Sequence, residues 1–381
     1  MADTRTALIL GLGRSGYAAA RLLCAQGCRV TIVDQSGGTL TASDLLALNS
    51  IGACVLPHQQ ELPAGAFDLG VVSPGFAVTS PWVIAAEARC RELLSELALG
   101  YRYSRCPLLA VTGTNGKSTL VMLLDTILRQ AGHRSLAGGN LGIPLCELVM
   151  RPDVPDWIVV EVSSFQLELA GDFHPHGAVF LNIQPDHLDR HGDMDTYFRT
   201  KCRVFSHMQA GDIAVVPAGL LVAIQGRAGC MHAQSEPEWI CFGEHPAAWC
   251  YDAQNHCLSG PREKIPLLHP YFDNPVTGAT AAAAAALVSG CCGVSGRAVA
   301  DGIAAFTPLG HRTELVAQQD DVMYIDDSKA TNMAAMCAAL AMQKGPVRLI
   351  AGGLLKENDL DWTKQVLKKR VACAYLIGDA A

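Results

Sequence analysis

A short segment of the 381-residue sequence carries the residues of a phosphate-binding loop. The segment "VTGTNGKST" (111–119) lies between an apolar, strand-like run and a helix-like run. In such a loop backbone N–H groups face phosphate, Lys117 reaches the terminal phosphates and Ser118 holds Mg²⁺. The usual form has glycine where this sequence has Val111, and the first glycine here is Gly113. Strand, lysine, hydroxyl and helix stay in order, so we expect nucleotide binding.

A second glycine-rich loop opens the chain. "GLGRSG" places glycines at 11, 13 and 16 between a strand and a helix, and Asp34 ends the next strand. Such glycines let the backbone approach a diphosphate at the helix N-terminus. A dinucleotide, another diphosphate, or a tight turn with nothing bound would each fit this pattern.

Carboxylates and histidines follow two later strands. Glu161 ends "WIVVE", where it could hold Mg²⁺ from the side opposite Ser118 or pair with a cation. The next strand is followed by a loop that could bind a second metal, although its side chains could equally be solvated: Asp186, His187, Asp189 and His191.

One predicted helix, "DTYFRTKCRVFSHM", carries a lysine within an apolar stripe. The spacing puts Lys201 on one face with Tyr197, Val204, Phe205 and Met208. Lys201 could extend its charge to water from a partly buried face. Alternatively it is desolvated, and its neutral amine could react with CO₂ to form an anionic carbamate ligand.

Further polar residues gather towards the C-terminus. Three cations near strand ends in an acidic protein indicate anionic ligands, although each alone could be a solvated charge. The residues are Asp327, Lys329, Thr331 and Asn332 in "IDDSKATN", Arg312 in "LGHRTE" and Lys356 in "AGGLLK".

Alternating strands and helices must position these loops. They predict an α/β protein with three consecutive wound-sheet domains. Residues 1–98 would form a Rossmann-like N-terminal domain, 99–306 a P-loop ATPase-like central domain, and 307–381 an incomplete Rossmann-like C-terminal domain. The last domain has three predicted strands, "VMYIDDS", "VRLIAGG" and "CAYLIGD".

Composition narrows the setting. The net charge of −7 argues against a nucleic-acid-binding surface. The 15 cysteines include no C-x-x-C pair, and no leader-like segment opens the sequence, so a reducing cytoplasm is expected. The apolar stretch "GATAAAAAALVSGCCG" is interpreted as a buried helix, and no membrane insertion is expected.

Taken in order along the whole chain, the motifs resemble those of the Mur ligase family of peptidoglycan synthesis. "GTNGKST" is typical of the family, which includes folylpolyglutamate synthases, and "SSFQLE" and "DSKATN" are typical of its glutamate-adding branch. The other matching motifs are "GLGRSG", "SPG" (73–75), "GGNLGIP" (138–144), "DHLDRHG", the lysine of "YFRTKCRVF" and "HRTE".

The resemblance implies an ATP-dependent amide-bond ligase. ATP would convert the carboxylate of UDP-N-acetylmuramoyl-L-alanine into an acyl phosphate, which the amine of D-glutamate attacks. It also implies a monomer with two Mg²⁺ ions. Ser118 and Glu161 would hold one ion, and His187 and a carbamylated Lys201 would hold the other. The catalytic residues that the resemblance implies are Lys117, Glu161, His187 and Lys201.

The resemblance also implies binding residues. ATP would contact Gly113, Thr114, Asn115, Gly116, Lys117, Ser118, Thr119, Asn274, Arg312, Asp327 and Lys329. The UDP-substrate would contact Gly13, Arg14, Ser15, Asp34, Gln35, Ser36, Ser73, Pro74, Gly75, Asn140, Ser163 and Gln166. D-Glutamate would meet Thr331 and Lys356.

The sequence departs from the family pattern in three places. The adenine-contact segment, usually H-N-x-x-N, reads Asp273-Asn274-Pro-Val-Thr277, and the loop before Lys356 reads "GGLLK". The family's C-terminal segment with further D-glutamate contacts is absent, so we expect an incomplete acceptor site. Two other functions stay open at this point: a non-catalytic nucleotide-binding remnant, and an NAD-dependent oxidoreductase based on "GLGRSG" and Asp34 alone.

Overall fold

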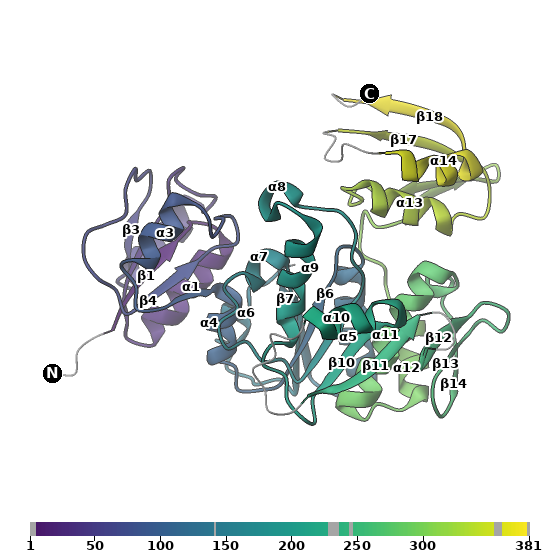
Figure 1. Ribbon diagram of the computed structural model, residues 1–381, viewed down its shortest axis with the longest axis horizontal. Coiled ribbons are helices and arrows are strands. Elements are labelled where there is room, and N and C mark those ends of the chain that lie inside the picture. Colours follow the sequence, from purple (N-terminus) through teal and green to yellow (C-terminus); the bar gives the residue numbers. More distant parts are fainter. Residues whose placement is uncertain (1–4, 141, 228–235, 244–246, 354–359, 379–381) are drawn as a thin grey trace.

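The computed structural model describes residues 5–140, 142–227, 236–243, 247–353 and 360–378. Three bodies follow one another along the chain (Figure 1). The first is a five-stranded parallel sheet in the order β3-β2-β1-β4-β5. Its strands are β1 (Thr6–Leu10), β2 (Arg29–Val33), β3 (Cys54–Leu56), β4 (Leu69–Val72) and β5 (Leu93–Ser95), and its helices are α1 (Arg14–Ala25), α2 (Ala42–Ser50) and α3 (Pro81–Glu87).

The strand order reverses at β1, which pairs with both β2 and β4. Loops that follow neighbouring parallel strands at such a switch point form the ligand crevice. Here these are the glycine loop after β1 and the "SPG" turn after β4. They lie so close that a Cβ on Gly11 would come within 2.6 Å of the Ser73 hydroxyl.

The central body contains a nine-stranded sheet in the order β14-β13-β12-β11-β10-β9-β6-β8-β7. Pairings are parallel from β7 to β12 and antiparallel at β13 and β14. The strands are β6 (Leu108–Thr112), β7 (Ser135–Gly139), β8 (Trp157–Glu161), β9 (Gly177–Phe180), β10 (Ile213–Pro217), β11 (Glu238–Gly243), β12 (Trp249–Asp252), β13 (Cys257–Ser259) and β14 (Lys264–Pro266).

Helices cover both faces of this sheet. Alternating side chains of β6 divide between two cores, with Leu109 and Val111 in one and Leu108 and Ala110 in the other. The first core includes residues of α5 (Lys117–Gln130), α11 (Pro275–Cys292) and α12 (Gly296–Ala304), and the second includes residues of α4 (Glu96–Arg102), α6 (Leu145–Leu148), α7 (Ser164–Leu167), α9 (Met194–Cys202) and α10 (Leu221–Arg227). A short helix, α8 (Leu188–His191), precedes α9.

Helix α11 confirms the prediction of a buried apolar helix. It is the one helix in the described ranges that is long and apolar enough to cross a membrane. Its residues from Ala281 to Val288 are completely buried, in a core shared with α5, α12 and the sheet. Pro275 begins the helix after the Asn274 cap, and Gly293 ends it at φ 63°.

The third body differs in detail from the three-strand prediction. Strand β16 (Val322–Asp326) pairs antiparallel with β15 (Glu314–Gln319), which the sequence analysis did not predict. The two residues between them, Asp320 and Asp321, have φ of 47° and 61°, as a tight hairpin turn requires. Strands β17 (Val347–Gly352) and β18 (Val371–Ile377) form a separate parallel pair, accompanied by α13 (Met333–Met342) and α14 (Lys364–Arg370). We keep 1–98, 99–306 and 307–381 as the proposed domain boundaries.

Candidate active site

The loop after β6 is held open by two glycines and one asparagine. Gly113 and Gly116 have φ of 148° and 81°, and α5 begins directly after them at Lys117. The Asn182 amide oxygen accepts from the backbone N–H groups of Thr114 and Asn115 at 3.0 and 2.9 Å. Sequence reasoning missed Asn182; the signal was a polar residue two positions after a buried strand.

Two lysines meet at this loop. Lys117 Nζ donates to the carbonyl oxygens of Gly113 (3.1 Å) and Thr114 (2.8 Å), and Lys201 Nζ donates to the same Gly113 oxygen at 2.8 Å. Lys201 is 2% exposed. Burial, reinforced by the charge of Lys117, lowers the pKa of Lys201 well below its ordinary value. Of the two interpretations from the sequence, this geometry favours the desolvated amine.

The helix that carries Lys201 is shorter than predicted. Helix α9 ends at Cys202 and continues as a 3₁₀ turn over Arg203–Phe205. The predicted face is nevertheless buried throughout, since Tyr197, Val204, Phe205 and Met208 are each at most 1% exposed. The tighter turn therefore keeps the apolar stripe on one side.

Ser118 and Glu161 form the inner wall of the site. The Ser118 hydroxyl donates to Glu161 Oε2 at 2.6 Å, and Asn140 Nδ2 donates to Glu161 Oε1 at 2.8 Å. Glu161 is 4% exposed and Ser118 3%. A buried carboxylate beside a hydroxyl is an oxygen donor set that suits Mg²⁺.

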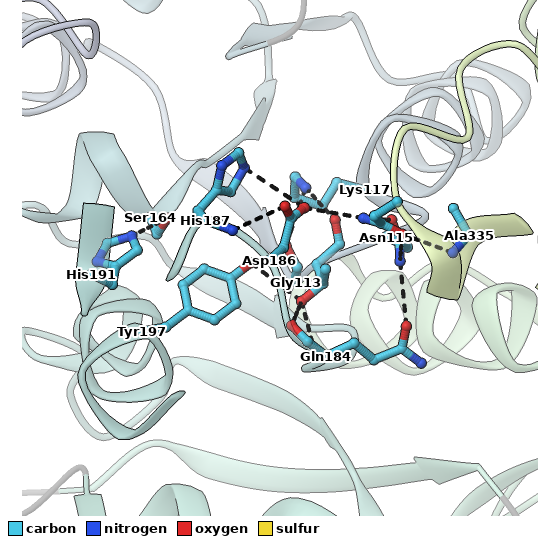
Figure 2. A network of polar contacts seen from close by, with 12 residues as sticks. Gly113, Asn115, Lys117, Ser164, Gln184, Asp186, His187, His191, Tyr197 and Ala335 are labelled. Atoms are coloured by element: carbon cyan, nitrogen blue, oxygen red, sulfur yellow. Dashed lines mark hydrogen bonds and ion pairs between the residues drawn. The ribbon is translucent and has the colours of Figure 1, made fainter. Parts of the chain in front are cut away.

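Asp186 and His187, from the loop after β9, lie beside Lys117 (Figure 2). The charge of Asp186 acts on both Lys117 and Lys201, and its Oδ2 lies 3.7 Å from His187 Nε2. His187 caps α8 at φ 54°, and its ring lies edge-on to that of Phe165, with the ring centroids 4.8 Å apart.

Residues of the third body contact the loop directly. Arg312 Nη2 donates to the Ser118 hydroxyl at 2.9 Å. The side-chain amides of Asn332 and Asn115 pair, and Asn332 Nδ2 also donates to Asp186 Oδ2 at 3.0 Å. The Asn332 oxygen caps α13. The cations Lys117 and Arg312 thus gather at this loop, where positive charge suits phosphate.

At the N-terminal crevice, the Asp34 carboxylate accepts hydrogen bonds from the neighbouring loops of its own body. It accepts from the Leu12 N–H at 2.8 Å and from the Ser36 N–H and hydroxyl at 2.8 and 3.0 Å. Burial alone would raise the pKa of Asp34, but these donors and the Gly37 N–H hold it below its usual value. Since both carboxylate oxygens are engaged, the geometry does not favour the ribose contact of an NAD-binding site.

The same loop contacts the central body. Gly13 caps α1, and a Cβ there would meet only Thr39, at 3.7 Å. The Arg14 guanidinium donates to the Gly142 carbonyl of the central body at 3.2 Å. Ser15 is half-buried beside them, and Gln35, Ser36 and Gly75 are exposed.

The chain matches two family models. Residues 5–95 match the Mur ligase MurD-like N-terminal domain, and residues 111–254 match the Mur ligase middle domain. A UDP-N-acetylmuramoylalanine–D-glutamate ligase from Pelotomaculum thermopropionicum is 36% identical over 98% of this chain and 82% of its own length. This chain belongs to the Mur ligase family. A relative of the same name from Desulfotalea psychrophila is 38% identical, with the same coverage of both chains.

Solved Mur ligase structures share the fold. MurF from Acinetobacter baumannii matches with a TM-score of 0.63 at 19% identity, covering 98% of this chain and 80% of that one. MurC from Thermotoga maritima matches with a TM-score of 0.53 at 15% identity, covering 98% and 90%. These likenesses bear out the predicted α/β architecture.

Two predicted channel residues of this Mur ligase hold a local structure. Ser163 and Gln166 form a reciprocal capping box at the start of α7, and Gln166 is 2% exposed. Their polar groups are therefore engaged with one another beside Glu161.

The altered adenine segment is also ordered by its own residues. Asn274 caps α11 and donates to the Thr277 hydroxyl at 2.7 Å, while Thr277 donates to the Tyr271 carbonyl. Asp273 accepts from the Tyr251 hydroxyl at 2.9 Å. The helix start is thus intact despite the two replacements.

The remaining predicted binding residues of the third body differ in their surroundings. Asp327 accepts from the Thr313 N–H at 2.8 Å, whereas Lys329 and Thr331 are exposed. Lys356 lies outside the described residues. Within the described ranges, the one group of three or more His, Cys, Asp or Glu side chains whose ligand atoms could meet at one metal ion is His311, Glu314 and Asp326. Its two carboxylates are hydrogen-bonded to His311, and Asp326 also accepts from the Ser328 N–H at 2.9 Å.

Proposed function

We propose that this Mur ligase joins D-glutamate to UDP-N-acetylmuramoyl-L-alanine at the expense of ATP. The observation that carries this function is the pair of cations Lys117 and Arg312 beside Ser118 and Glu161. A carboxylate is a poor electrophile and two anions repel, so phosphoryl transfer to it needs such a concentration of positive charge. The names of the relatives supply the two substrates.

The first step forms an acyl phosphate. A carboxylate oxygen of the L-alanyl group attacks the γ-phosphorus of ATP, and the bond to the β-phosphate oxygen breaks. Lys117 and the Arg312 guanidinium neutralise the charge that develops on the phosphates, while N–H groups of the loop orient them. Ser118 and Glu161 fit one Mg²⁺, which when bound would draw electrons from the phosphate oxygens.

Lys201 would contribute an anionic ligand. Its buried neutral amine reacts with CO₂, forming an N–C bond and releasing one proton, to give a carbamate. With His187, this carbamate would hold a second Mg²⁺ near the transferred phosphate. The lowered pKa of Lys201 supports the step, because only the neutral amine is a nucleophile.

The second step forms the amide. The neutral D-glutamate amine attacks the acyl carbon and a C–N bond forms. The nitrogen loses one proton to water, the acyl C–O bond breaks, and inorganic phosphate leaves. The cations that received the γ-phosphate stabilise the same phosphate as it departs. Thr331 and Lys356 are our proposed contacts for D-glutamate.

The nucleotide end of the substrate would lie at the N-terminal crevice. Its diphosphate fits the helix terminus at Gly13, Arg14 and Ser15, and the turn at 73–75 forms the opposite wall. Asn140, Ser163 and Gln166 would follow the muramyl-alanine part towards Glu161. We further propose a cytoplasmic monomer.

The decisive experiment follows phosphate release and product mass from purified protein. We expect release only when ATP, Mg²⁺, UDP-N-acetylmuramoyl-L-alanine and D-glutamate are all present, with L-glutamate as the inactive control. Glu161→Gln keeps partners for Ser118 and Asn140 but loses the charge, and we expect a rate loss of about 100-fold or more. Release without the UDP-substrate would contradict the proposal. Binding of the UDP-substrate without release would favour the non-catalytic alternative.

A further inference from the structure

Arg190 links the two walls of the substrate crevice. It belongs to α8 in the central body, but its guanidinium donates to two carbonyl oxygens of the N-terminal body, Pro74 at 2.6 Å and Phe76 at 2.7 Å. Both acceptors lie in the turn at 73–76, which the Phe76 N–H closes onto the Ser73 carbonyl at 3.0 Å.

The guanidinium is fixed on its other sides. Nε donates to Glu168 Oε1 at 3.1 Å, Nη2 pairs with Glu168 Oε2, and the group lies over the Phe165 ring, 3.9 Å from its centroid. The side chains of Arg190 and Glu168 are only 10% and 9% exposed. A planar, forked cation that uses both edges in this way is preorganised, and lysine cannot reproduce it.

Holding the Pro74 carbonyl also sets the direction of a donor. In a trans peptide the C=O and the following N–H point in opposite directions. Arg190 therefore turns the Gly75 N–H away from itself. Gly75 is exposed, and a Cβ built on it meets nothing within 4 Å, so a ligand can approach this residue.

The same arginine is tied to the chemical end of the site. Arg190 follows His187 by three residues, and its backbone N–H donates to the His187 carbonyl at 3.1 Å. Phe165, on which the guanidinium stacks, also contacts the His187 ring. One side chain thus fixes both the substrate turn and the helix that His187 caps.

We propose that Arg190 is a positioning residue that aims the Gly75 N–H at the anionic UDP-substrate and holds the 73–76 turn in register with His187. This inference rests on the proposed function for its substrate. Arg190 reaches that substrate only through the Pro74–Gly75 peptide, so its loss weakens UDP-substrate binding more than ATP binding.

The variants are Arg190→Lys and Arg190→Ala, with Arg203→Ala as the matched control. Arg203 donates to the Leu167 and Glu168 carbonyls within the central body and borders the same cavity of about 530 Å³ as Arg190. We expect both Arg190 variants to raise KM for the UDP-substrate about tenfold or more and KM for ATP by less than about twofold. Arg203→Ala should change neither KM.

Two further readouts separate positioning from folding. Guanidinium ions added to the buffer can enter this cavity and reach the space that Arg190→Ala leaves empty. Millimolar guanidinium should therefore restore part of the affinity for the UDP-substrate. In the unliganded protein, amide hydrogen exchange over residues 73–77 should rise in both Arg190 variants and not in the control. Equal increases in both KM values, no rescue, or unchanged exchange would overturn the inference. If the wild-type protein does not bind the UDP-substrate, the proposed function is wrong. The hydrogen-exchange measurement would still decide whether Arg190 holds the turn at 73–76.

Discussion

The amines of Lys117 and Lys201 donate to one carbonyl oxygen, that of Gly113, at 3.1 and 2.8 Å. Two full positive charges at such separations would repel strongly in a buried site. Burial lowers the pKa of both amines, and the charge of Lys117 lowers that of Lys201 further, so we expect Lys201 to be the neutral, reactive amine beside the phosphate loop.

Lys201→Met should stabilise the protein and abolish its activity. Methionine keeps the apolar stem, and the Gly113 carbonyl retains the Lys117 donor, so the main change is removal of a costly buried amine. Because the folded pKa lies below the unfolded value, this cost is largest at low pH and vanishes as pH approaches about 10.4. We expect a gain of about 1–4 kcal/mol near neutral pH in CO₂-depleted buffer, measured by urea unfolding.

Lys201→Ala should also be inactive, but for a reason that can be reversed. The smaller side chain leaves space where the carbamate would lie, and a short carboxylic acid such as formate can supply the missing anion. We expect partial recovery of phosphate release with added formate in Lys201→Ala, and none in Lys201→Met, where the space is filled. Full activity of Lys201→Ala without rescue would exclude the carbamate.

Substitutions at Asn332 can distinguish its role as the cap of α13 from its contact with the phosphate loop. Asn332→Ser keeps an oxygen for the Ala335 N–H but is too short for Asn115 and Asp186, whereas Asn332→Ala loses both. Both variants should raise KM for ATP, roughly fivefold for each hydrogen bond lost. Only Asn332→Ala should also lose about 1 kcal/mol of stability. An unchanged KM in both would mean that this contact does not assist ATP.

The sequence was sufficient to predict the local order of a strand, its loop and the next helix. The loops at Gly11 and Gly113, and Glu161 at the end of β8, follow from such local order. Contacts between distant segments were not predictable, and Asn115 and Asn332 meet across a separation of 217 residues. The turn at Asp320 was missed because two aspartates replace the usual Asn-Gly or Asp-Gly pair.

The burial of Glu96, at the junction of the N-terminal and central bodies, predicts that stability depends on pH. Burial raises its pKa to about 7, although the Cys146 N–H donates to its Oε1 at 2.6 Å. Since the folded pKa exceeds the unfolded one, stability is full below about pH 4.3 and falls as pH rises through 7. Glu96→Gln should flatten this profile and gain about 3 kcal/mol at pH 8, measured by denaturant unfolding. Glu147→Gln is the control from the adjoining helix α6, and a loss of pH dependence in it instead would contradict the assignment to Glu96.

Gly13 and Gly16 should separate ligand binding from folding within one loop. A Cβ on Gly16 would lie 2.0 Å from the Gly11 carbonyl oxygen, so Gly16→Ala must push α1 away from β1. A Cβ on Gly13 meets only Thr39 and projects where a diphosphate would approach. We expect Gly13→Ala to stay within about 1 kcal/mol of the wild-type stability and to raise KM for the UDP-substrate about tenfold, with KM for ATP unchanged. Gly16→Ala should instead lower the melting temperature and impair both substrates together. If Gly13→Ala bound the UDP-substrate normally, the diphosphate would have to lie away from the N-terminus of α1, and the role proposed for this loop would be wrong.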